Sequence, residues 1–358
     1  MQKIIAVLAG DGIGQEVMPQ AVKILNIIAN KYHHQFIIQG GYIGGAAYEK
    51  MGAHFPEETK VLCQNADAIL FGSVGGPTQD AQLPKWKDCE KNSILALRKT
   101  FKLHANIRPA RIYQELLAIC PLKESLIANG LEFIIVRELV GDIYFGEHRQ
   151  WLQDNKRHAS DIAEYNEDQI AAVTHCAFQL AKNRRQKLTS VDKANVLDTS
   201  KLWREIVSEI AKEYPTVRLE HMLVDNCAMQ LIINPVQFDV IVTANLFGDI
   251  LSDAAAALPG SLGLMPSASL NEKGFGLYEP SGGSAPDIAG KNIANPIAQI
   301  LSAALMLRYS FELHQEADAI ERAVSEALKA GFRTKDIAEA GAPYVGTKEI
   351  TEAIESFI

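Results

Sequence analysis

The stretch NLFGDILSDAAAAL carries two aspartates, Asp249 and Asp253, four residues apart. On a helix, both carboxylates would project from one face, within about 6 Å of each other, and would repel unless a cation lay between them. Asp225, in MLVDNCAMQL, is a candidate third ligand, and an all-oxygen set suits Mg²⁺ or Mn²⁺. Two acids at this spacing alone would favour a solvated helix face, but the otherwise apolar helix and the preceding glycine favour a metal site.

Three arginines lie in apolar surroundings: Arg98 in ILALRK, Arg108 in ANIRPA and Arg137 in IIVREL. A guanidinium group binds a carboxylate through two parallel hydrogen bonds, so a cluster of three would suit a di- or tricarboxylate. Each arginine alone is more simply a structural ion pair, and Glu138 directly follows one of them. Together with a metal site, the three indicate a substrate clamp.

Two further side chains could move protons. Lys193, in SVDKANVL, follows a strand-like run, and a partly buried lysine near a metal site can donate or accept a proton. Tyr144, in GDIYFGEHR, could supply a phenol to the same relay, although a tyrosine between two apolar residues is more often simply packed.

The opening LAGDGIGQEV has glycines at positions 10, 12 and 14. A Rossmann fingerprint needs G-x-G-x-x-G and an acidic residue about twenty positions later. Here Gln15 stands where the third glycine belongs, and HQFIIQGG contains no acid. The pattern therefore predicts a tight strand-to-helix turn, and any nicotinamide cofactor is expected to bind elsewhere.

Residues 277–296, LYEPSGGSAPDIAGKNIANP, are dense in glycine, proline and small residues. Such a segment could be a plain connection. Its length without an apolar pattern instead favours a binding loop, with the acid Asp287 placed to accept hydrogen bonds.

Composition limits the classes of protein that remain. The chain has 358 residues, 47% of them apolar and 22% charged, as in an ordinary globular protein. The formal net charge of −8 argues against a nucleic-acid partner, and we expect neither a membrane-spanning helix nor a secretory signal. Five cysteines without a C-x-x-C spacing favour reduced thiols in the cytoplasm.

These residues need strands and helices to position them. Strand-like runs (KIIAVLA, ADAILFGSV, LEFIIVREL, KLTSVDKA and FDVIVTANL) alternate with amphipathic segments at residues 14–31, 166–184, 202–214 and 295–313. A last helix is predicted to end at Gly331. This alternation predicts an α/β fold built on a largely parallel sheet, without internal repeats or a flexible linker.

Seven ordered motifs together resemble the β-decarboxylating dehydrogenases, the isocitrate/isopropylmalate dehydrogenase family. They are GDGIGQEV, LRKTFKLHANIRPA, VRELVGDIYFGE, VDKANVL, NLFGDILSD, GSLGLMPSASL and GSAPDIAGKNIANP. The resemblance implies two α/β domains, the first discontinuous and not of the Rossmann type. Residues 1–104 and 262–358 would form the cofactor-side domain. Residues 105–261 would form the dimerising substrate and metal domain, with an arm near 138–160.

The resemblance also assigns roles. The substrate carboxylates would be held by the three arginines, the metal by Asp225, Asp249 and Asp253, and proton transfer would fall to Tyr144 and Lys193. Asp225 would also reach the substrate, and Asn195 would lie close to the substrate and the nicotinamide. Lys193 and Asp225 would complete the site of a second copy, so an obligatory homodimer is expected.

The expected cofactor is NAD, because a carboxylate at Asp287 would hold the ribose hydroxyls and repel the 2′-phosphate of NADP. The matching cofactor residues are Gly76, Pro77, Gly283, Ser284, Ala285, Asp287 and Asn295. One position departs from the family pattern: Gly282 stands where many members have a histidine.

Substrate choice is expected to depend on Ile94 and Leu95, which match an apolar pocket for an isopropyl group. The expected reaction is oxidative decarboxylation of (2R,3S)-3-isopropylmalate to 4-methyl-2-oxopentanoate, a step of leucine biosynthesis. Isocitrate carries a third carboxylate, and an apolar wall would leave that group without a partner. Two alternatives remain: a sister enzyme acting on isocitrate, homoisocitrate or tartrate, and a catalytically idle or regulatory subunit with the same fold.

Overall fold

The computed structural model describes residues 1–127 and 130–358, which form two compact units. Unit 1 comprises Met1–Phe101, Ile112–Pro121 and Ala256–Ile358, and unit 2 comprises Lys102–Arg111 and Leu122–Ala255. Residues 112–121 therefore fall in unit 1, although the sequence places them in the second domain. The domain boundaries proposed from the sequence stay predictions.

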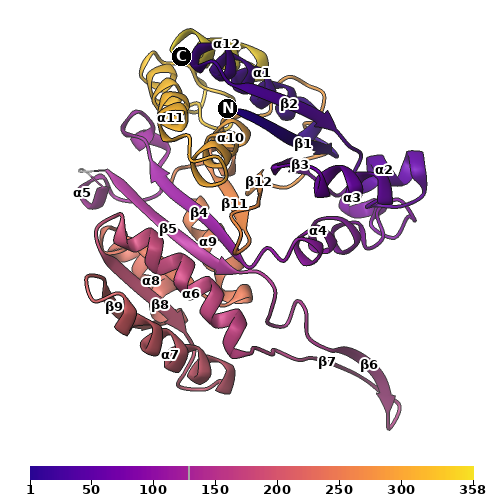
Figure 1. Cartoon of the computed structure of the whole chain (residues 1–358), viewed down its shortest axis with the longest axis vertical. Coiled ribbons are helices and arrows are strands. Elements are labelled where there is room, and N and C mark those ends of the chain that lie inside the picture. Colours follow the sequence, from indigo (N-terminus) through magenta and orange to yellow (C-terminus); the bar gives the residue numbers. More distant parts are fainter. Residues whose placement is uncertain (128–129) are drawn as a thin grey trace. The chain divides into compact units, whose positions relative to one another are not determined.

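In unit 1, an apolar sheet carries the opening turn (Figure 1). Its strand order is β2-β1-β3-β12-β11, with parallel pairing except between β11 and β12. The strands are β1 (Gln2–Gly10), β2 (Gln35–Gly40), β3 (Ala68–Ser73), β11 (Pro266–Leu270) and β12 (Gly276–Pro280). Every residue of β3 is buried, as expected for a central strand covered on both faces.

Helices complete unit 1: α1 (Gly14–Tyr32), α2 (Gly44–Met51), α3 (Glu57–Gln64), α4 (Ala96–Thr100), α10 (Ile297–Tyr309), α11 (His314–Lys329) and α12 (Thr347–Ser356). Helix α10 is buried over most of its length and forms much of the core. A π-helical turn, Lys91–Leu95, leads into α4. Such turns are often found at functional sites.

In unit 2, the strand order is β4-β5-β10-β8-β9. Within this order, β5, β10, β8 and β9 are parallel to one another. These strands are β4 (Ala105–Ile112), β5 (Leu131–Glu138), β8 (Lys187–Asp192), β9 (Arg218–Leu223) and β10 (Val240–Thr243). The helices are α5 (Glu124–Ile127), α6 (Glu167–Lys182), α7 (Asp198–Ile210), α8 (Val224–Ile233) and α9 (Asn245–Ala256).

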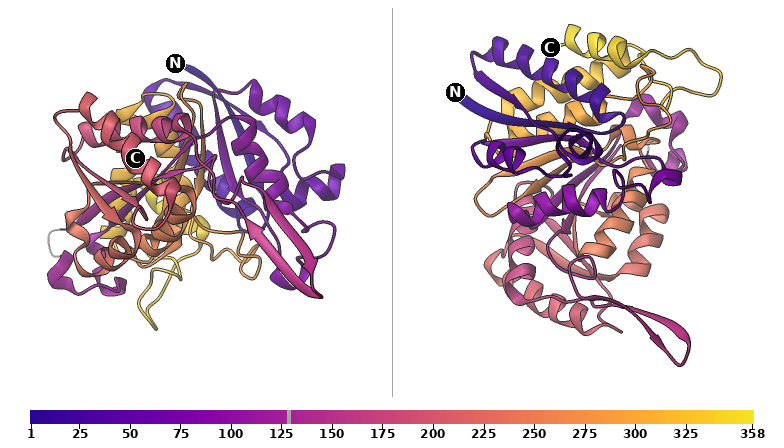
Figure 2. Two further views of the ribbon diagram at one scale, coloured as in Figure 1. Left: turned by 90° about the horizontal axis from the view of Figure 1, so that it is seen from below. Right: turned by 90° about the vertical axis from the view of Figure 1, so that its right-hand side faces the viewer.

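A hairpin projects from unit 2. Strands β6 (His148–Gln153) and β7 (Lys156–Asp161) pair antiparallel and extend away from the rest of the unit in all three views (Figures 1 and 2). Almost all of their side chains are exposed, including Leu152 at 75%. A two-stranded hairpin is marginally stable alone, so this one is expected to need a partner surface.

The α/β class and the largely parallel sheet predicted from the sequence are confirmed. The helix predicted at residues 202–214 is displaced, since α7 runs from Asp198 to Ile210 and a separate 3₁₀ turn, Ala211–Glu213, follows it. Gly331, at φ 91°, follows the end of α11 as expected. Among the described residues, no helix is both long and apolar enough to cross a membrane.

Candidate active site

The sheet of unit 2 brings several predicted residues to one edge. Arg137 lies at the carboxyl end of β5, α9 follows β10, and Lys193 follows β8. Asp225 lies in the first turn of α8, which follows β9. Because these four strands are parallel, their carboxyl ends share an edge. Ligand sites of α/β proteins collect at such edges.

Arg137 is 5% exposed and is held against α9. Its Nε donates to Asn245 Oδ1 at 3.0 Å, and its Nη1 donates to Asp249. Gly248 permits this approach, because a Cβ there would lie 2.6 Å from the Arg137 Cγ. The glycine before Asp249 thus has a packing role that the sequence alone did not specify.

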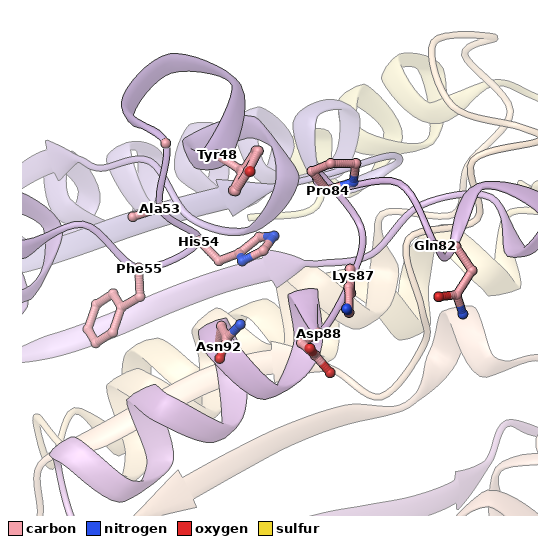
Figure 3. A pocket seen from close by; sticks show the side chains of 10 residues that line it. Tyr48, Ala53, His54, Phe55, Gln82, Pro84, Lys87, Asp88 and Asn92 are labelled. Carbon is pink, nitrogen blue, oxygen red and sulfur yellow. The ribbon is translucent and has the colours of Figure 1, made fainter.

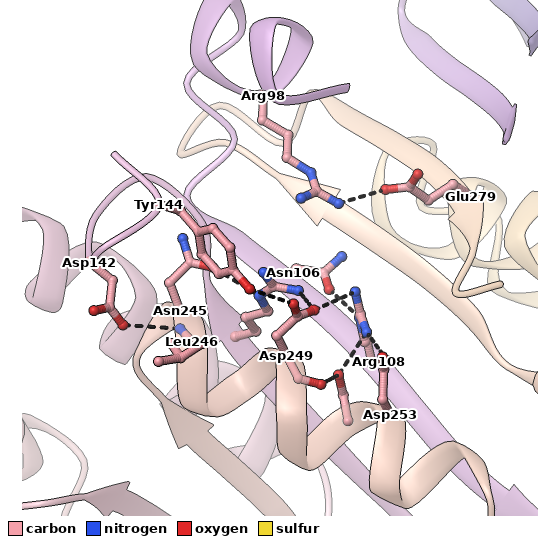
Figure 4. Close-up of polar contacts among 12 residues, drawn as sticks. Arg98, Asn106, Arg108, Asp142, Tyr144, Asn245, Leu246, Asp249, Asp253 and Glu279 are labelled. Carbon is pink, nitrogen blue, oxygen red and sulfur yellow. Dashed lines mark hydrogen bonds and ion pairs between the residues drawn. The ribbon is translucent and has the colours of Figure 1, made fainter. Parts of the chain in front are cut away.

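Arg108 lies on β4 and reaches the second aspartate (Figure 4). Its Nη1 lies 3.0 Å from Asp253 Oδ1, and its Nη2 lies 3.8 Å from Asp249 Oδ1. Asn106 and Ser252 accept further hydrogen bonds from the guanidinium, each at 2.7 Å. The aspartates retain exposed side chains, 34% for Asp249 and 62% for Asp253, so they remain open to a ligand.

Tyr144 completes this group. Its hydroxyl donates to Asp249 Oδ2 at 2.8 Å, and the guanidinium carbon of Arg137 lies 5.6 Å from its ring centre. Partial burial and the neighbouring Asp249 raise the pKa of Tyr144 above its ordinary value. The phenol is therefore protonated at neutral pH and can act as a proton donor.

Lys193 and Asp225 pair with each other, at 2.5 Å between Nζ and Oδ1, and this contact lowers the pKa of Asp225. Across the described part of the chain, no three His, Cys, Asp or Glu side chains are grouped to hold a metal ion. Strand β8 separates β9 from β10, so two strand spacings, about 10 Å, lie between the strand preceding Asp225 and the strand preceding α9. Asn195 is exposed in the loop after Lys193.

Arg98 belongs to unit 1, where its Nη2 lies 3.1 Å from Glu279 Oε1. Its buried Nε has no hydrogen-bond partner among the described residues. An unpaired buried donor is costly unless a ligand satisfies it, which suits the carboxylate-binding role predicted for Arg98. Ile94 is buried and Leu95 half-buried, both on the π-helical turn before α4.

The opening glycine turn contacts the predicted cofactor loop directly. The Ile13 N–H donates to the Ser284 carbonyl at 2.8 Å, and a Cβ on Gly12 would lie 1.9 Å from that oxygen. Ala285 follows in the left-handed region at φ 39°, while Gly283 is exposed. The turn therefore supports the loop.

A cavity of about 410 Å³ opens beside this loop. Its walls include the apolar side chains of Ile13, Ile288 and Ile293, with Asn295 and Asp336 supplying polar groups. Apolar walls with a few fixed polar groups are typical of small-molecule sites. Asn295 is itself oriented, since its Nδ2 donates to Asp336 at 3.0 Å and its Oδ1 accepts from the Ile297 N–H.

Three other predicted cofactor positions have different surroundings. Asp287 precedes the cavity residue Ile288 and is exposed. Gly76 packs on Trp86, because a Cβ there would lie 2.3 Å from the indole, and Pro77 follows it in the loop after β3. Gly76 is thus fixed against Trp86, and its predicted contact with the cofactor stays a prediction.

A second cavity, of about 770 Å³, lies elsewhere in unit 1 (Figure 3). His54 stacks on Tyr48 at its wall, with ring centres 4.9 Å apart, and Lys87, Asp88 and Asn92 also line it. The side chains that line it include no residue predicted from the sequence to bind substrate, cofactor or metal.

Sequence reasoning missed three residues that hold the predicted ones. Glu279 pairs with Arg98, Asn245 accepts from Arg137, and Ser252 accepts from Arg108. Glu279 lies in the loop motif LYEPSGG and Asn245 begins NLFGDILSD, so both were inside stretches already singled out. Their partners are distant in the sequence, and no local pattern identifies them.

Paired carboxylates beside buried arginines on an α/β scaffold have the chemistry to bind an anionic substrate and a hard metal ion. The family model for isocitrate/isopropylmalate dehydrogenases matches residues 4–354. The chain belongs to this family, whose members include metal-dependent oxidoreductases.

Relatives and solved structures agree with the family model. The chain is 53% identical to 3-isopropylmalate dehydrogenase of Escherichia coli K12, covering 99% of this chain and 97% of the relative. Identity to the Haemophilus influenzae enzyme of that name is 54%, covering 98% and 99%. The structure of isocitrate dehydrogenase from Methylococcus capsulatus matches with a TM-score of 0.87 at 34% identity, covering 99% of both chains. A β-decarboxylating dehydrogenase from Thermococcus kodakarensis matches with a TM-score of 0.80 at 34% identity, covering 99% and 96%.

Proposed function

We propose that this protein is an enzyme of leucine biosynthesis that converts (2R,3S)-3-isopropylmalate to 4-methyl-2-oxopentanoate by NAD-dependent oxidative decarboxylation. The observation that carries the proposal is the pairing of Asp249 and Asp253 with the buried Arg137 and Arg108. Full-length similarity to 3-isopropylmalate dehydrogenases supports the choice of substrate.

The residues fit a divalent cation. Asp249 and Asp253 offer only oxygen donors on one exposed helix face, as Mg²⁺ and Mn²⁺ require. A bound Mg²⁺ or Mn²⁺ would polarise the substrate oxygens as a Lewis acid. We assign Asp225 of a second copy as the further ligand, because within one chain it pairs with Lys193.

The arginines position the substrate. Arg98, Arg108 and Arg137 bind its carboxylates, and burial strengthens these contacts because it excludes water. Ile94 and Leu95 receive the isopropyl group and disfavour a third carboxylate. Asn195 is assigned to the reacting end of the substrate.

Proton transfer is assigned to Lys193 and Tyr144. Once its pairing with Asp225 is released, Lys193 would accept the proton of the substrate hydroxyl, and NAD, when bound, would supply the hydride acceptor. Tyr144 is kept protonated by burial and by Asp249, and it helps to protonate the carbon left after CO₂ departs. Lys193 is thus assigned as a proton acceptor and Tyr144 as a proton donor.

The cavity beside Ile13 and Asn295 is the proposed site of the adenosine end of NAD, with Gly283, Ser284 and Ala285 in the adjoining loop. Asp287 is exposed and available to ribose hydroxyls, which favours NAD over NADP. We assign Gly76 and Pro77 to the same cofactor. The five free cysteines, three of them buried, suit a reducing cytoplasm.

We infer a homodimer with shared sites. Helix α8 exposes Met229 at 49%, Ile232 at 63% and Ile233 at 53%, and α9 exposes Ile250 at 59%. Apolar side chains gathered on two helices of one unit indicate an interface. Ile232→Asp is expected to shift the protein toward monomer in analytical ultracentrifugation and to abolish activity, whereas Leu83→Asp, at an exposed site of unit 1, should do neither.

Turnover tests the proposed reaction. Purified protein is assayed for NADH or NADPH formation with 3-isopropylmalate and, separately, with isocitrate, homoisocitrate and tartrate, using NAD or NADP with and without Mg²⁺. We expect NADH from 3-isopropylmalate, dependent on Mg²⁺. Equal or better turnover of another acid would overturn the substrate assignment, and no turnover of any acid would support an idle or regulatory subunit.

A further inference from the structure

Glu138 is a buried acid next to Arg137 that the proposed reaction does not use. It is 0% exposed, and its carboxylate accepts from the Val140 N–H at 2.5 Å, the Gly141 N–H at 2.9 Å and the Tyr165 hydroxyl at 2.9 Å. Side chains alternate along a strand, so Glu138 points away from the face that Arg137 presents to α9. Three donors therefore bind the Glu138 carboxylate, which has no direct contact with the predicted metal ligands among the described residues.

Tyr165 connects this acid to α9. Its hydroxyl donates to Glu138 and accepts from the backbone N–H of Asn245 at 2.8 Å. Gly141 makes room for the ring, because a Cβ there would lie 2.4 Å from the Tyr165 Cε1. The ring is also held edge-on to Trp203, with ring centres 5.7 Å apart at 67°. Tyr165 is therefore packed on two sides and bonded at its tip.

Asn245 completes the hydrogen-bond network that links Glu138 to Arg137. Its Oδ1 accepts from the Arg137 Nε and its Nδ2 donates to the Gly141 carbonyl at 3.1 Å, so its backbone N–H and both ends of its side-chain amide have partners in this network. Asp142 secures the next residue of the helix, accepting from the Leu246 N–H at 3.0 Å (Figure 4). The first N–H groups of a helix have no partner within it, so these bonds fix where α9 begins.

The position of this first turn determines the position of the site. Asn245, Asp249 and Asp253 are spaced four residues apart and lie on one face of α9. A shift of the helix along its axis would move both carboxylates together. It would also release the Arg137 Nε from its partner.

We propose that Glu138 and Tyr165 are positioning residues for the reaction, which hold Asn245 and thereby set Arg137 and the carboxylates of α9 in their working places. This inference rests on the proposed function for its catalytic consequence. Its structural part, the fixing of the first turn of α9, stands apart from any activity.

Tyr165→Phe tests the inference, because it removes the hydroxyl and keeps the packed ring. The loss of the two hydrogen bonds of this hydroxyl should lower kcat/KM for 3-isopropylmalate about tenfold and leave the KM for NAD at its wild-type value. Tyr214→Phe is the matched control, since its hydroxyl lies 3.0 Å from His175 Nδ1, away from the predicted site residues. That control should keep wild-type kinetics.

Amide hydrogen exchange supplies a reading that needs no turnover. In Tyr165→Phe, the peptide containing Asn245 and Leu246 should exchange about tenfold faster than in the wild type, because its N–H has lost an acceptor. Unchanged exchange in this peptide would overturn the inference even if the wild type proved inactive on every acid tested. Faster exchange with unchanged kcat/KM in an active wild type would overturn the catalytic part.

Glu138→Gln and the double variant complete the test. Residues of one network have non-additive effects, so Glu138→Gln/Tyr165→Phe should lose less than the product of the two single losses in kcat/KM. Independent, multiplicative losses would show that the two residues do not act through a shared connection to Asn245, and would overturn the proposal in that form.

Discussion

Arg98 and Glu279 form a buried ion pair in which the two side chains are only 10% and 11% exposed. The pair orients a guanidinium whose Nε has no other partner among the described residues. Removing one member of such a pair leaves a charge uncompensated in the interior.

Replacing Glu279 should therefore affect substrate binding first. Glu279→Gln keeps the shape and an acceptor but loses the charge that holds Arg98, so we expect KM for 3-isopropylmalate to rise about tenfold. Initial-rate kinetics measure this change. Glu326→Gln is the control, because Glu326 pairs with Lys329 three residues away on the surface. An unchanged KM in Glu279→Gln would contradict the positioning of Arg98 by this acid.

Ile94 offers a test of the isopropyl pocket. Ile94→Ala removes buried apolar contacts and should lower kcat/KM for 3-isopropylmalate at least about tenfold, since each methylene in such a pocket contributes about that factor. Ile94→Leu preserves volume and should lose far less. Equal losses in both variants would mean that Ile94 is packed in the fold without contacting substrate.

Asp287 should decide between the two nicotinamide cofactors. Asp287→Ala removes the charge that repels a 2′-phosphate, so the ratio of kcat/KM for NAD over NADP should fall. The ratio is measured with saturating 3-isopropylmalate and Mg²⁺. Glu272→Ala, at another exposed acid, should leave it unchanged. A constant ratio in Asp287→Ala would remove the assigned role.

Shared active sites predict complementation between inactive chains. Lys193→Ala and Arg137→Ala should each abolish most turnover as homodimers. Co-expressed, they should recover roughly a quarter of wild-type activity, because half of randomly paired dimers are mixed and each has one intact site of two. The chains carry separate tags, and mixed dimers purified by both tags should reach roughly half of wild-type activity, because every one of them has one intact site of two. No recovery would place Lys193 and Arg137 in the site of the same subunit.

The pH dependence of stability should report on Glu138. Burial raises its pKa to about 7, against the lowering effect of its hydrogen bonds, so the folded protein holds this proton at a higher pH than the unfolded chain does. Stability is consequently expected to fall as the pH rises from about 4.5 to 7, since the folded state binds more protons in that range.

Glu138→Gln cannot titrate and should flatten this slope. Thermal unfolding of both proteins across pH 4.5 to 8 provides the comparison, and Tyr165 stays protonated throughout because its pKa is raised well above 10. Parallel curves for the two proteins would show that other groups produce the dependence.

The sequence supported the α/β class because its periodicity is strong. Apolar runs of strand length become β1, β3, β5, β8 and β10, and the glycine turn at residues 10–14 forms where expected. Element boundaries were harder to predict: α7 begins at Asp198, four residues before its predicted start, because the apolar pattern used for the prediction begins only at Leu202.

Residue types and local spacing predicted part of the candidate site, but not the contacts between residues far apart in the sequence. Asp249 and Asp253 share a helix, so their common face follows from spacing alone. The pairing of Arg108 with Asp253 joins residues far apart in the sequence, and Glu279, Asn245 and Tyr165 act through partners that only the fold supplies. The sequence predicted that Asp225 binds a metal together with Asp249 and Asp253, but within one chain its carboxylate pairs with Lys193.

The contact between Gly12 and the Ser284 carbonyl carries a genetic consequence. A Cβ at position 12 would collide with a backbone oxygen, which every amino acid at position 284 also possesses. A suppressor screen started from Gly12→Ala should therefore recover revertants to glycine, and no exchange of the side chain at residue 284 alone should rescue the mutant.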